Sequence, residues 1–214
     1  MKFALLCDFD GTIVTVDTGE YLLRKYVKED WEIFGTSFEK GEITLEECIQ
    51  RQLSMLTVPR QVMLEELERV TIIRSHFSDL VEYCGLRGVP FVIVSAGLDF
   101  VIQHFLQRAS VAGPVEIHVP RSRFIGLYLN LTFPPLNDES SLDFKQDLVK
   151  DYQRQGYTVF YVGDGLSDYN AVRQAQYSFV IKGSKLAMLC HRERIPHQGI
   201  RDFQEVIDSM DSML

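Results

Sequence analysis

The sequence has few of the features that mark secreted, metal-cluster or membrane-spanning proteins. Its four cysteines are scattered and form no C-x-x-C pair, so neither a zinc site nor a disulfide framework is indicated. No apolar run reaches the length of a membrane span, and the N-terminal run is too short for a signal peptide. We therefore expect a cytoplasmic protein with reduced thiols that does not act on a membrane.

Positive charge is also scarce. The chain has 22 Lys and Arg against 30 Asp and Glu, which gives a formal net charge of -8. Because nucleic acids and anionic membranes select clusters of Lys and Arg, we expect neither as a partner. With 214 residues, 46% of them hydrophobic, the chain is long enough for one buried core and a small inserted domain.

The strongest local pattern is the N-terminal stretch, where the apolar run at residues 3–7 stops at two carboxylates. Such a run is typical of a buried parallel strand, and ligands bind at the carboxyl ends of these strands. Strand alternation turns Asp8 and Asp10 toward one pocket and Phe9 into the core. Two carboxylates this close need a counter-charge, and Mg2+ with a substrate phosphate would provide it. A surface turn that ends a strand is the alternative.

A helical region follows. Between residues 14 and 74 the apolar positions recur at helical spacing with hardly a β-rich segment. Helices are predicted at residues 21–26, at 45–53 after the capping-box pattern at Thr44, and from Pro59, in the first helical position, to about residue 70. We interpret this region as a helical insertion.

The remainder alternates strands and helices. Buried strands are predicted at residues 91–94, 115–119, 158–162 and 177–181, and residues 124–133 resemble an antiparallel hairpin around Gly126. This alternation predicts the α/β class, with a parallel sheet flanked by helices on both faces. We therefore expect a core of residues 1–13 and 75–214 and an inserted helical cap of residues 14–74.

Polar residues follow three of the later apolar segments. Ser95 lies at a strand-to-helix turn, which suits an anion, although an ordinary helix cap explains it equally well. Lys145 occupies a first helical turn, where the helix dipole disfavours a cation and a nearby anion would compensate. Asp164 lies between two glycines that permit a tight turn, and Asp168 begins the next helix.

Taken together, these segments resemble the four motifs of the haloacid dehalogenase superfamily, in order and in setting. The segments are Asp8-Phe9-Asp10-Gly11-Thr12, Ser95, Lys145, and Gly163-Asp164-Gly165 with Asp168. The helical insertion is similar to the C1 cap of the phosphoserine phosphatase-like branch, and the cap and tail resemble the methionine-salvage phosphatases within it. The resemblance implies a Rossmann-like core and a Mg2+-dependent phosphatase of a small phosphorylated metabolite, either a monomer or a homodimer.

The resemblance also implies roles for the acidic residues. Asp8 would be the nucleophile that forms an aspartyl-phosphate, and Asp10 the general acid and base. Mg2+ would be held by Asp8, by Asp10 through its backbone carbonyl, and by Asp164. Asp168 would hold the metal through water or orient Lys145.

Phosphate and leaving group would be bound by other residues. The resemblance implies that Ser95, Ala96 and Lys145 cradle the phosphate. In the cap, ungapped counting from Asp8 points to Asp17, and counting along the Gly41-Glu42-Ile43 segment points to Gln52, with Arg51 beside it. Asp17 and Arg51 are our candidates for substrate specificity. A phosphotransferase or mutase with the same chemistry, and a weakly catalytic protein that binds a phosphorylated ligand, are the alternatives to a phosphatase.

Overall fold

The N-terminal apolar run forms β1 (Lys2–Cys7), a central strand of a six-stranded parallel sheet. The computed structural model describes residues 2–109, 111 and 113–213. The strand order is β3-β2-β1-β6-β7-β8, with the remaining strands at β2 (Phe91–Val94), β3 (Glu116–His118), β6 (Tyr157–Gly163), β7 (Tyr177–Ile181) and β8 (Gln198–Ile200). The predicted α/β class with a parallel sheet is confirmed.

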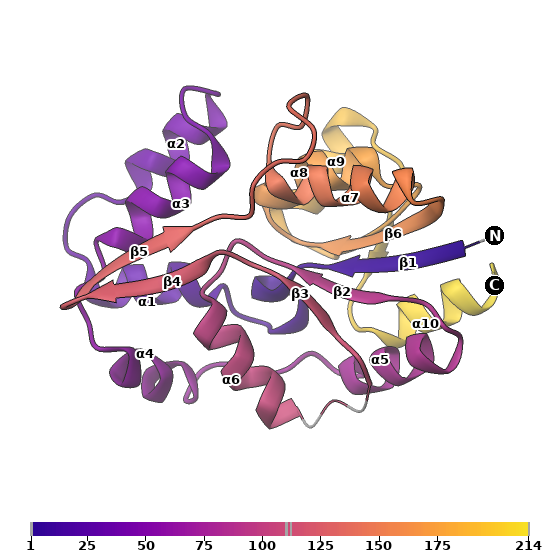
Figure 1. Cartoon of the computed structure of the whole chain (residues 1–214), viewed down its shortest axis with the longest axis horizontal. Coiled ribbons are helices and arrows are strands. Elements are labelled where there is room, and N and C mark those ends of the chain that lie inside the picture. The colour runs from indigo at the N-terminus through magenta and orange to yellow at the C-terminus, as the bar shows by residue number, and fades with distance from the viewer. Residues whose placement is uncertain (1, 110, 112, 214) are drawn as a thin grey trace.

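Helices cover both faces of the sheet (Figure 1). One face carries α5 (Phe77–Leu86), α6 (Asp99–Ala109) and α10 (Gln204–Asp211), and the other carries α7 (Phe144–Arg154), α8 (Tyr169–Gln174) and α9 (Lys185–Glu193). Along β1, Leu5 and Cys7 pack on the first face, whereas Ala4 and Leu6 pack on the second. Because both faces are covered, the strand is apolar from Phe3 to Cys7. Within the described residues, no helix combines the length and apolarity needed to cross a bilayer.

The order in which the chain adds strands to the sheet reverses at β1. It runs outward from β1 through β2 to β3, and then returns to form β6 on the other side of β1. A crevice forms at the carboxyl ends of the strands on either side of such a switch point, and ligands of open α/β sheets bind there. The backbone N–H of Asp8 donates to the carbonyl of Val162 at 2.9 Å, so the two strand ends stay joined at this point.

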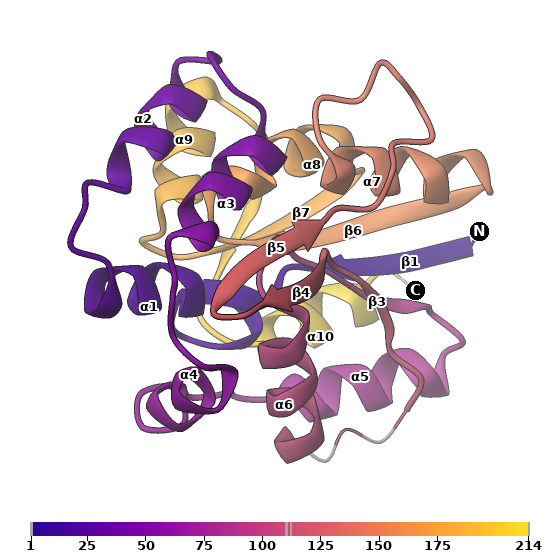
Figure 2. The same ribbon diagram turned by 60° about the vertical axis from the view of Figure 1, so that its left-hand side comes forward.

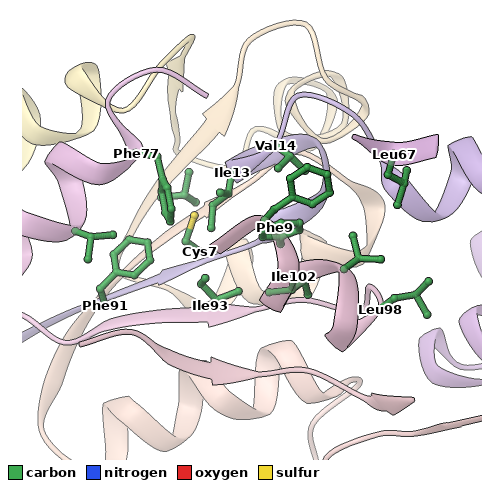
Figure 3. Packing of buried hydrophobic residues seen from close by; sticks show 14 of the residues in the cluster. Cys7, Phe9, Ile13, Val14, Leu67, Phe77, Phe91, Ile93, Leu98 and Ile102 are labelled. Atoms are coloured by element: carbon green, nitrogen blue, oxygen red, sulfur yellow. The ribbon is translucent and has the colours of Figure 1, made fainter. Parts of the chain in front are cut away.

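The turn after β1 is anchored in the core by Phe9. Phe9 is fully buried in the same cluster as Val14, Leu98 and Ile102 (Figure 3). The turn at Phe9–Ile13 is closed by a hydrogen bond of 3.0 Å from the Val14 N–H to the Phe9 carbonyl. Burial of the Phe9 ring therefore fixes the position of the two carboxylates that flank it.

Residues 14–74 form four helices beside the sheet. These are α1 (Thr18–Tyr26), α2 (Glu32–Glu39), α3 (Leu45–Ser54) and α4 (Arg60–Leu67). The segment joins the sheet through two adjoining linkers, with an isolated bridge between Val14 and Ile73 and a 2.8 Å hydrogen bond from the Arg74 N–H to the Ile13 carbonyl. Pro59 is the N-cap of α4 and precedes the helix, so its predicted place in the first helical position was wrong by one residue.

The predicted hairpin packs against the helical segment of residues 14–74. It consists of β4 (Arg121–Ile125) and β5 (Tyr128–Thr132), antiparallel, and it lies beside α3 (Figure 2). The Leu131 N–H donates to Gln50 of α3 at 2.7 Å, and the Phe144 N–H at the start of α7 donates to Glu46 of α3 at 3.1 Å. Helix α3 is therefore hydrogen-bonded to both the hairpin and the sheet-covering helices.

Two Leu→Ala substitutions test the assignment of the core. Leu5 is 0% exposed in β1, whereas Leu86 at the end of α5 is 82% exposed. Leu5→Ala should lower the free energy of unfolding by about 2–5 kcal/mol, because it leaves a cavity in the packed core. Leu86→Ala should change it by less than about 0.5 kcal/mol. Urea denaturation of both variants measures the difference, and equal losses would contradict the assignment.

Candidate active site

A cavity of about 440 Å³ lies where β1, β2 and β6 end, between the sheet and helices α1, α2 and α3. Its floor is acidic and polar, and is lined by Asp8, Asp10, Ser95, Lys145 and Asp164. These residues lie far apart in the sequence. They meet because parallel strands bring their carboxyl ends to one edge of the sheet.

Asp8 is held in one orientation at the end of β1. It is only 4% exposed, and its Oδ1 accepts a hydrogen bond from the Phe9 N–H at 2.8 Å and lies 3.0 Å from Nζ of Lys145. Burial and then the nearby Asp168 carboxylate raise the pKa of Asp8 well above its ordinary value, and Lys145 offsets this only in part. The floor thus carries more negative charge than one lysine balances.

Lys145 is fully buried in the first turn of α7. Its Nζ lies 2.7 Å from Oδ1 of Asp168 and 3.0 Å from Oδ1 of Asp8, and it also donates to Oγ of Ser167 at 3.2 Å. Burial lowers the pKa of Lys145, but the carboxylates of Asp168 and Asp8 outweigh burial, so the pKa is raised overall. Lys145 is therefore a permanent cation, and its apparent misplacement in the helix is explained by its anionic partners.

Asp164 lies against the turn that follows β1. Its Oδ1 accepts a hydrogen bond from Oγ1 of Thr12 at 2.9 Å. Gly11 has a φ of +68°, and a Cβ there would lie 2.2 Å from Oδ2 of Asp164, so only glycine fits. Burial and the charge of Asp168 raise the pKa of Asp164 to about 7.

Asp168 accepts hydrogen bonds on both of its carboxylate oxygens and is fully buried. Oδ1 accepts from Nζ of Lys145 at 2.7 Å and from the Tyr161 hydroxyl at 2.8 Å. Oδ2 accepts from the backbone N–H groups of Asp164 and Gly165, each at 3.0 Å. These contacts fix the Asp164 turn and Lys145 relative to each other.

The floor has a donor set that suits a hard divalent cation. Carboxylate oxygens of Asp8, Asp164 and Asp168 lie within 4.8 Å of one another. Mg2+ prefers oxygen ligands, and a cation here would counter the burial and the Asp168 charge that raise the pKa values of Asp8 and Asp164. Asp168 already accepts four hydrogen bonds, so Asp8 and Asp164 are the more available ligands.

Asp10, the residue after Phe9, also lines the cavity. Its Oδ1 accepts two hydrogen bonds from Thr18, at 3.0 Å from the N–H and 2.5 Å from Oγ1. A Cβ on Gly97 would lie 2.2 Å from Oδ2 of Asp10, so any larger residue there would displace the Asp10 carboxylate. Burial and the Asp17 carboxylate raise the pKa of Asp10 to about 7, against the opposing effect of Thr18. Thr18 and Gly97 were not among the predicted site residues, although Gly97 lies in the Ser95-Ala96-Gly97 turn that follows β2.

Ser95 and Ala96 line the same cavity at the end of β2. Ser95 is 1% exposed, and its Oγ accepts a hydrogen bond from the Gly97 N–H at 3.2 Å. Helix α6 begins only at Asp99, so Ser95 belongs to the turn before the helix and is not its cap.

The two cap residues named from the sequence lie in different places. Asp17 lines the cavity, accepts a 2.8 Å hydrogen bond from the Glu20 N–H, and has a pKa raised by burial. Arg51 lies outside the cavity lining on an exposed side of α3, where it pairs with Glu47 and stacks on Phe34. The structure therefore does not bring Arg51 to the site.

The roof of the cavity combines apolar side chains with paired charges. Its apolar lining comes from Leu23, Trp31, Phe38, Ile49 and Leu53. Arg24 pairs with Glu20 at 2.9 Å and with Glu32 at 3.0 Å, and Nζ of Lys185 lies 4.0 Å from Glu20. Both cations of the roof thus already face carboxylates.

Residues 5–173 match the family model described as haloacid dehalogenase-like hydrolase. A 2-hydroxy-3-keto-5-methylthiopentenyl-1-phosphate phosphatase of Brevibacillus brevis is 28% identical over 211 residues, 96% of this chain and 94% of that protein. A protein of the same name from Geobacillus kaustophilus is 28% identical over 218 residues, 99% of this chain and 97% of that protein.

Solved structures of phosphoserine phosphatase have a similar fold. A phospho-aspartyl intermediate analogue of phosphoserine phosphatase superposes with a TM-score of 0.73 at 18% identity, over 97% of this chain and 98% of that one. A substrate-bound phosphoserine phosphatase complex gives a TM-score of 0.72 at 16% identity, over 98% of each chain. At these identities the likeness is one of fold.

The raised pKa of Asp164 predicts a pH dependence for the metal-free protein. Because the folded-state pKa is about 7 and that of an unfolded Asp is about 3.9, the folded protein holds more protons than the unfolded chain between these values. Stability should therefore fall as pH rises from about 4 to about 7. Denaturant unfolding of the wild type and Asp164→Asn without metal isolates this effect, and the wild type should lose stability relative to the variant across that window.

Saturating Mg2+ is the control for that experiment. A cation that binds the ionised carboxylates of the folded protein adds stability, most at the high-pH end. A wild type that follows Asp164→Asn at every pH, with and without Mg2+, would contradict the electrostatics assigned to the floor.

Proposed function

Since the chain belongs to the haloacid dehalogenase-like hydrolase family, we propose that it is a Mg2+-dependent phosphatase of a small phosphorylated metabolite, which reacts through an aspartyl-phosphate. The observation that carries this proposal is the orientation of Asp8. Its carboxylate borders the cavity, held by Lys145 and the Phe9 N–H, with Asp10 close by. The phosphatase names of the relatives and structural neighbours agree with it.

Asp8 and Asp10 divide the chemistry. A carboxylate oxygen of Asp8 attacks phosphorus, and the bond from phosphorus to the leaving oxygen breaks as Asp10 protonates that oxygen. Asp10, now a carboxylate, removes a proton from water, whose oxygen attacks phosphorus, releasing phosphate and restoring Asp8. A pKa of about 7 suits Asp10 to give and accept a proton near neutral pH.

The remaining floor residues stabilise charge. Asp8, Asp164 and the backbone carbonyl of Asp10 would hold Mg2+, which when bound neutralises the negative charge of the carboxylates and the phosphate. Asp168, with four hydrogen bonds already accepted, orients Lys145.

The phosphate oxygens would be bound at the ends of β2 and α7. Lys145 supplies a buried cation, and Ser95 and Ala96 border the cavity at the turn before α6. Fixed donors of this kind stabilise charge as it redistributes in the transition state, because they need no reorganisation.

The roof favours an uncharged leaving group. A substrate carboxylate would lie near Glu20, Glu32 and Asp17, and the roof cations Arg24 and Lys185 already face carboxylates. The apolar lining suits an apolar body instead. The substrate named for the Brevibacillus brevis relative, a hydroxy-keto-methylthiopentenyl phosphate, has such a leaving group, whereas phosphoserine carries a carboxylate. We therefore favour a substrate whose leaving group is uncharged, with Asp17 facing that leaving group.

Two alternatives share this site. A phosphotransferase or mutase would pass the phosphoryl group from Asp8 to another acceptor, and a binding protein would hold a phosphorylated ligand without turnover. The paired carboxylates Asp8 and Asp10 favour catalysis, since binding alone needs no group that moves a proton. Release of phosphate into water, with no acceptor alcohol added, separates the phosphatase from both alternatives.

Asp8→Asn tests the nucleophile. The amide cannot attack phosphorus, so hydrolysis of p-nitrophenyl phosphate in Mg2+ should fall at least about a thousandfold. Asp151→Asn, on a helix surface where Asp151 pairs with Arg154, should retain wild-type turnover. Removal of metal with EDTA should abolish wild-type turnover, and added Mg2+ should restore it. Substantial turnover by a clean Asp8→Asn preparation would refute the assignment.

Substrate selectivity tests the roof. The kcat/KM for O-phosphoserine should be at least about tenfold below that for a phosphate ester of an uncharged thioether alcohol, because a carboxylate near like charges is repelled. Glu39 also lines the roof, so Glu39→Gln, which removes one of these like charges, should reduce the difference in kcat/KM between the two esters. Equal kcat/KM values for the two esters would argue against an uncharged leaving group.

A further inference from the structure

Tyr161 is a fully buried tyrosine in β6 to which the proposed reaction assigns no role. Its neighbours Phe160 and Val162 pack on the opposite face of the sheet, while Tyr161 packs with the residues under α7 and α8. A phenylalanine would fill the same space without burying a polar atom. A buried tyrosine hydroxyl needs a hydrogen-bond partner, so the identity of that partner points to what the hydroxyl does.

The partner of Tyr161 is Asp168. The hydroxyl donates to Oδ1 of Asp168 at 2.8 Å, the same oxygen that accepts from Nζ of Lys145 at 2.7 Å. Lys145 in turn lies 3.0 Å from Oδ1 of Asp8. Phenol, carboxylate, ammonium and candidate nucleophile therefore form one continuous chain of contacts.

This chain is shielded from water along its length. Asp168, Lys145 and Tyr161 are each 0% exposed, and Asp8 is 4% exposed. In such a setting a change in one hydrogen bond is felt by the next, because no solvent screens or replaces it.

We propose that Tyr161 is a positioning residue, which shares Oδ1 of Asp168 with Lys145 and thereby holds the lysine ammonium against Asp8. This inference rests on the proposed function for its catalytic consequence. An oxygen that accepts from both a phenol and an ammonium attracts the ammonium less than one that accepts from the ammonium alone. Without the phenol, Lys145 moves toward Asp168 and contributes less to Asp8 and to the phosphate in transit.

The chain provides a matched control in Tyr152. Tyr152 is 6% exposed in α7 and belongs to the same core cluster as Tyr161. Its hydroxyl donates to Oε2 of Glu116 on β3 at 2.8 Å, and neither residue lines the cavity. Tyr161→Phe and Tyr152→Phe thus each remove one oxygen from a tyrosine-to-carboxylate hydrogen bond, and only in the first does that carboxylate also accept from Lys145.

Steady-state kinetics with p-nitrophenyl phosphate and Mg2+ compares the two variants. Tyr161→Phe should lower kcat about tenfold, because the Lys145 ammonium then forms a weaker charged hydrogen bond in the transition state. KM should stay within about twofold, because the roof that contacts the leaving group is unchanged. Tyr152→Phe should keep kcat within about twofold of the wild type. Thermal unfolding verifies that both variants fold. Equal kcat values for the two variants would show that Tyr161 acts only in folding stability.

A second measurement does not depend on turnover. The 1H–15N signal of the Lys145 ammonium can be assigned because it is missing from Lys145→Met. This signal should shift in Tyr161→Phe and keep its wild-type position in Tyr152→Phe. If the wild type hydrolyses no phosphate ester, the proposed function fails while this spectrum still tests the positioning. An unchanged Lys145 signal in Tyr161→Phe would overturn the inference.

Discussion

The concentration of negative charge at the ends of β1 and β6 is the constraint on which the rest of this structure depends. Carboxylates of Asp8, Asp164 and Asp168 approach within 4.8 Å of one another, and a single buried lysine faces them. Burial and then the Asp168 carboxylate raise the pKa values of Asp8 and Asp164, and Lys145 offsets this only in part. A divalent cation, which takes oxygen ligands, would offset the repulsion among these carboxylates.

The packing around the site makes that crowding structurally tolerable. Phe9 anchors the turn after β1 in the core, and Gly11 allows this turn to lie against Asp164. Arg74, at the exit of the helical segment, donates to the carbonyl of Thr12 at 2.7 Å and to that of Gly11 at 2.6 Å. The residue that leads from the cap back to the sheet therefore also secures the turn that carries the candidate catalytic carboxylates.

The helices over the cavity add selectivity to this charge pattern. Hydrogen bonds from the hairpin and from α7 hold α3 through Gln50 and Glu46, so the roof stands in a defined position. The cations of the roof pair with neighbouring carboxylates, so the surface that remains to contact a leaving group is apolar. In the function that we propose, the floor binds the phosphate and the roof discriminates between leaving groups.

The sequence by itself determined the parallel sheet and the acidic ends of β1 and β6, because strand periodicity and the residues that interrupt it are local properties. Tertiary structure alone decided which distant side chains complete the site. Thr18 reaches Asp10 and Tyr161 reaches Asp168 only after the chain has folded, and no local pattern encodes such contacts. Arg51 turns away from the cavity, whereas its neighbour Gln52, the residue that counting along the sequence reached, lines it, because the rotation of a helix about its axis is set by packing.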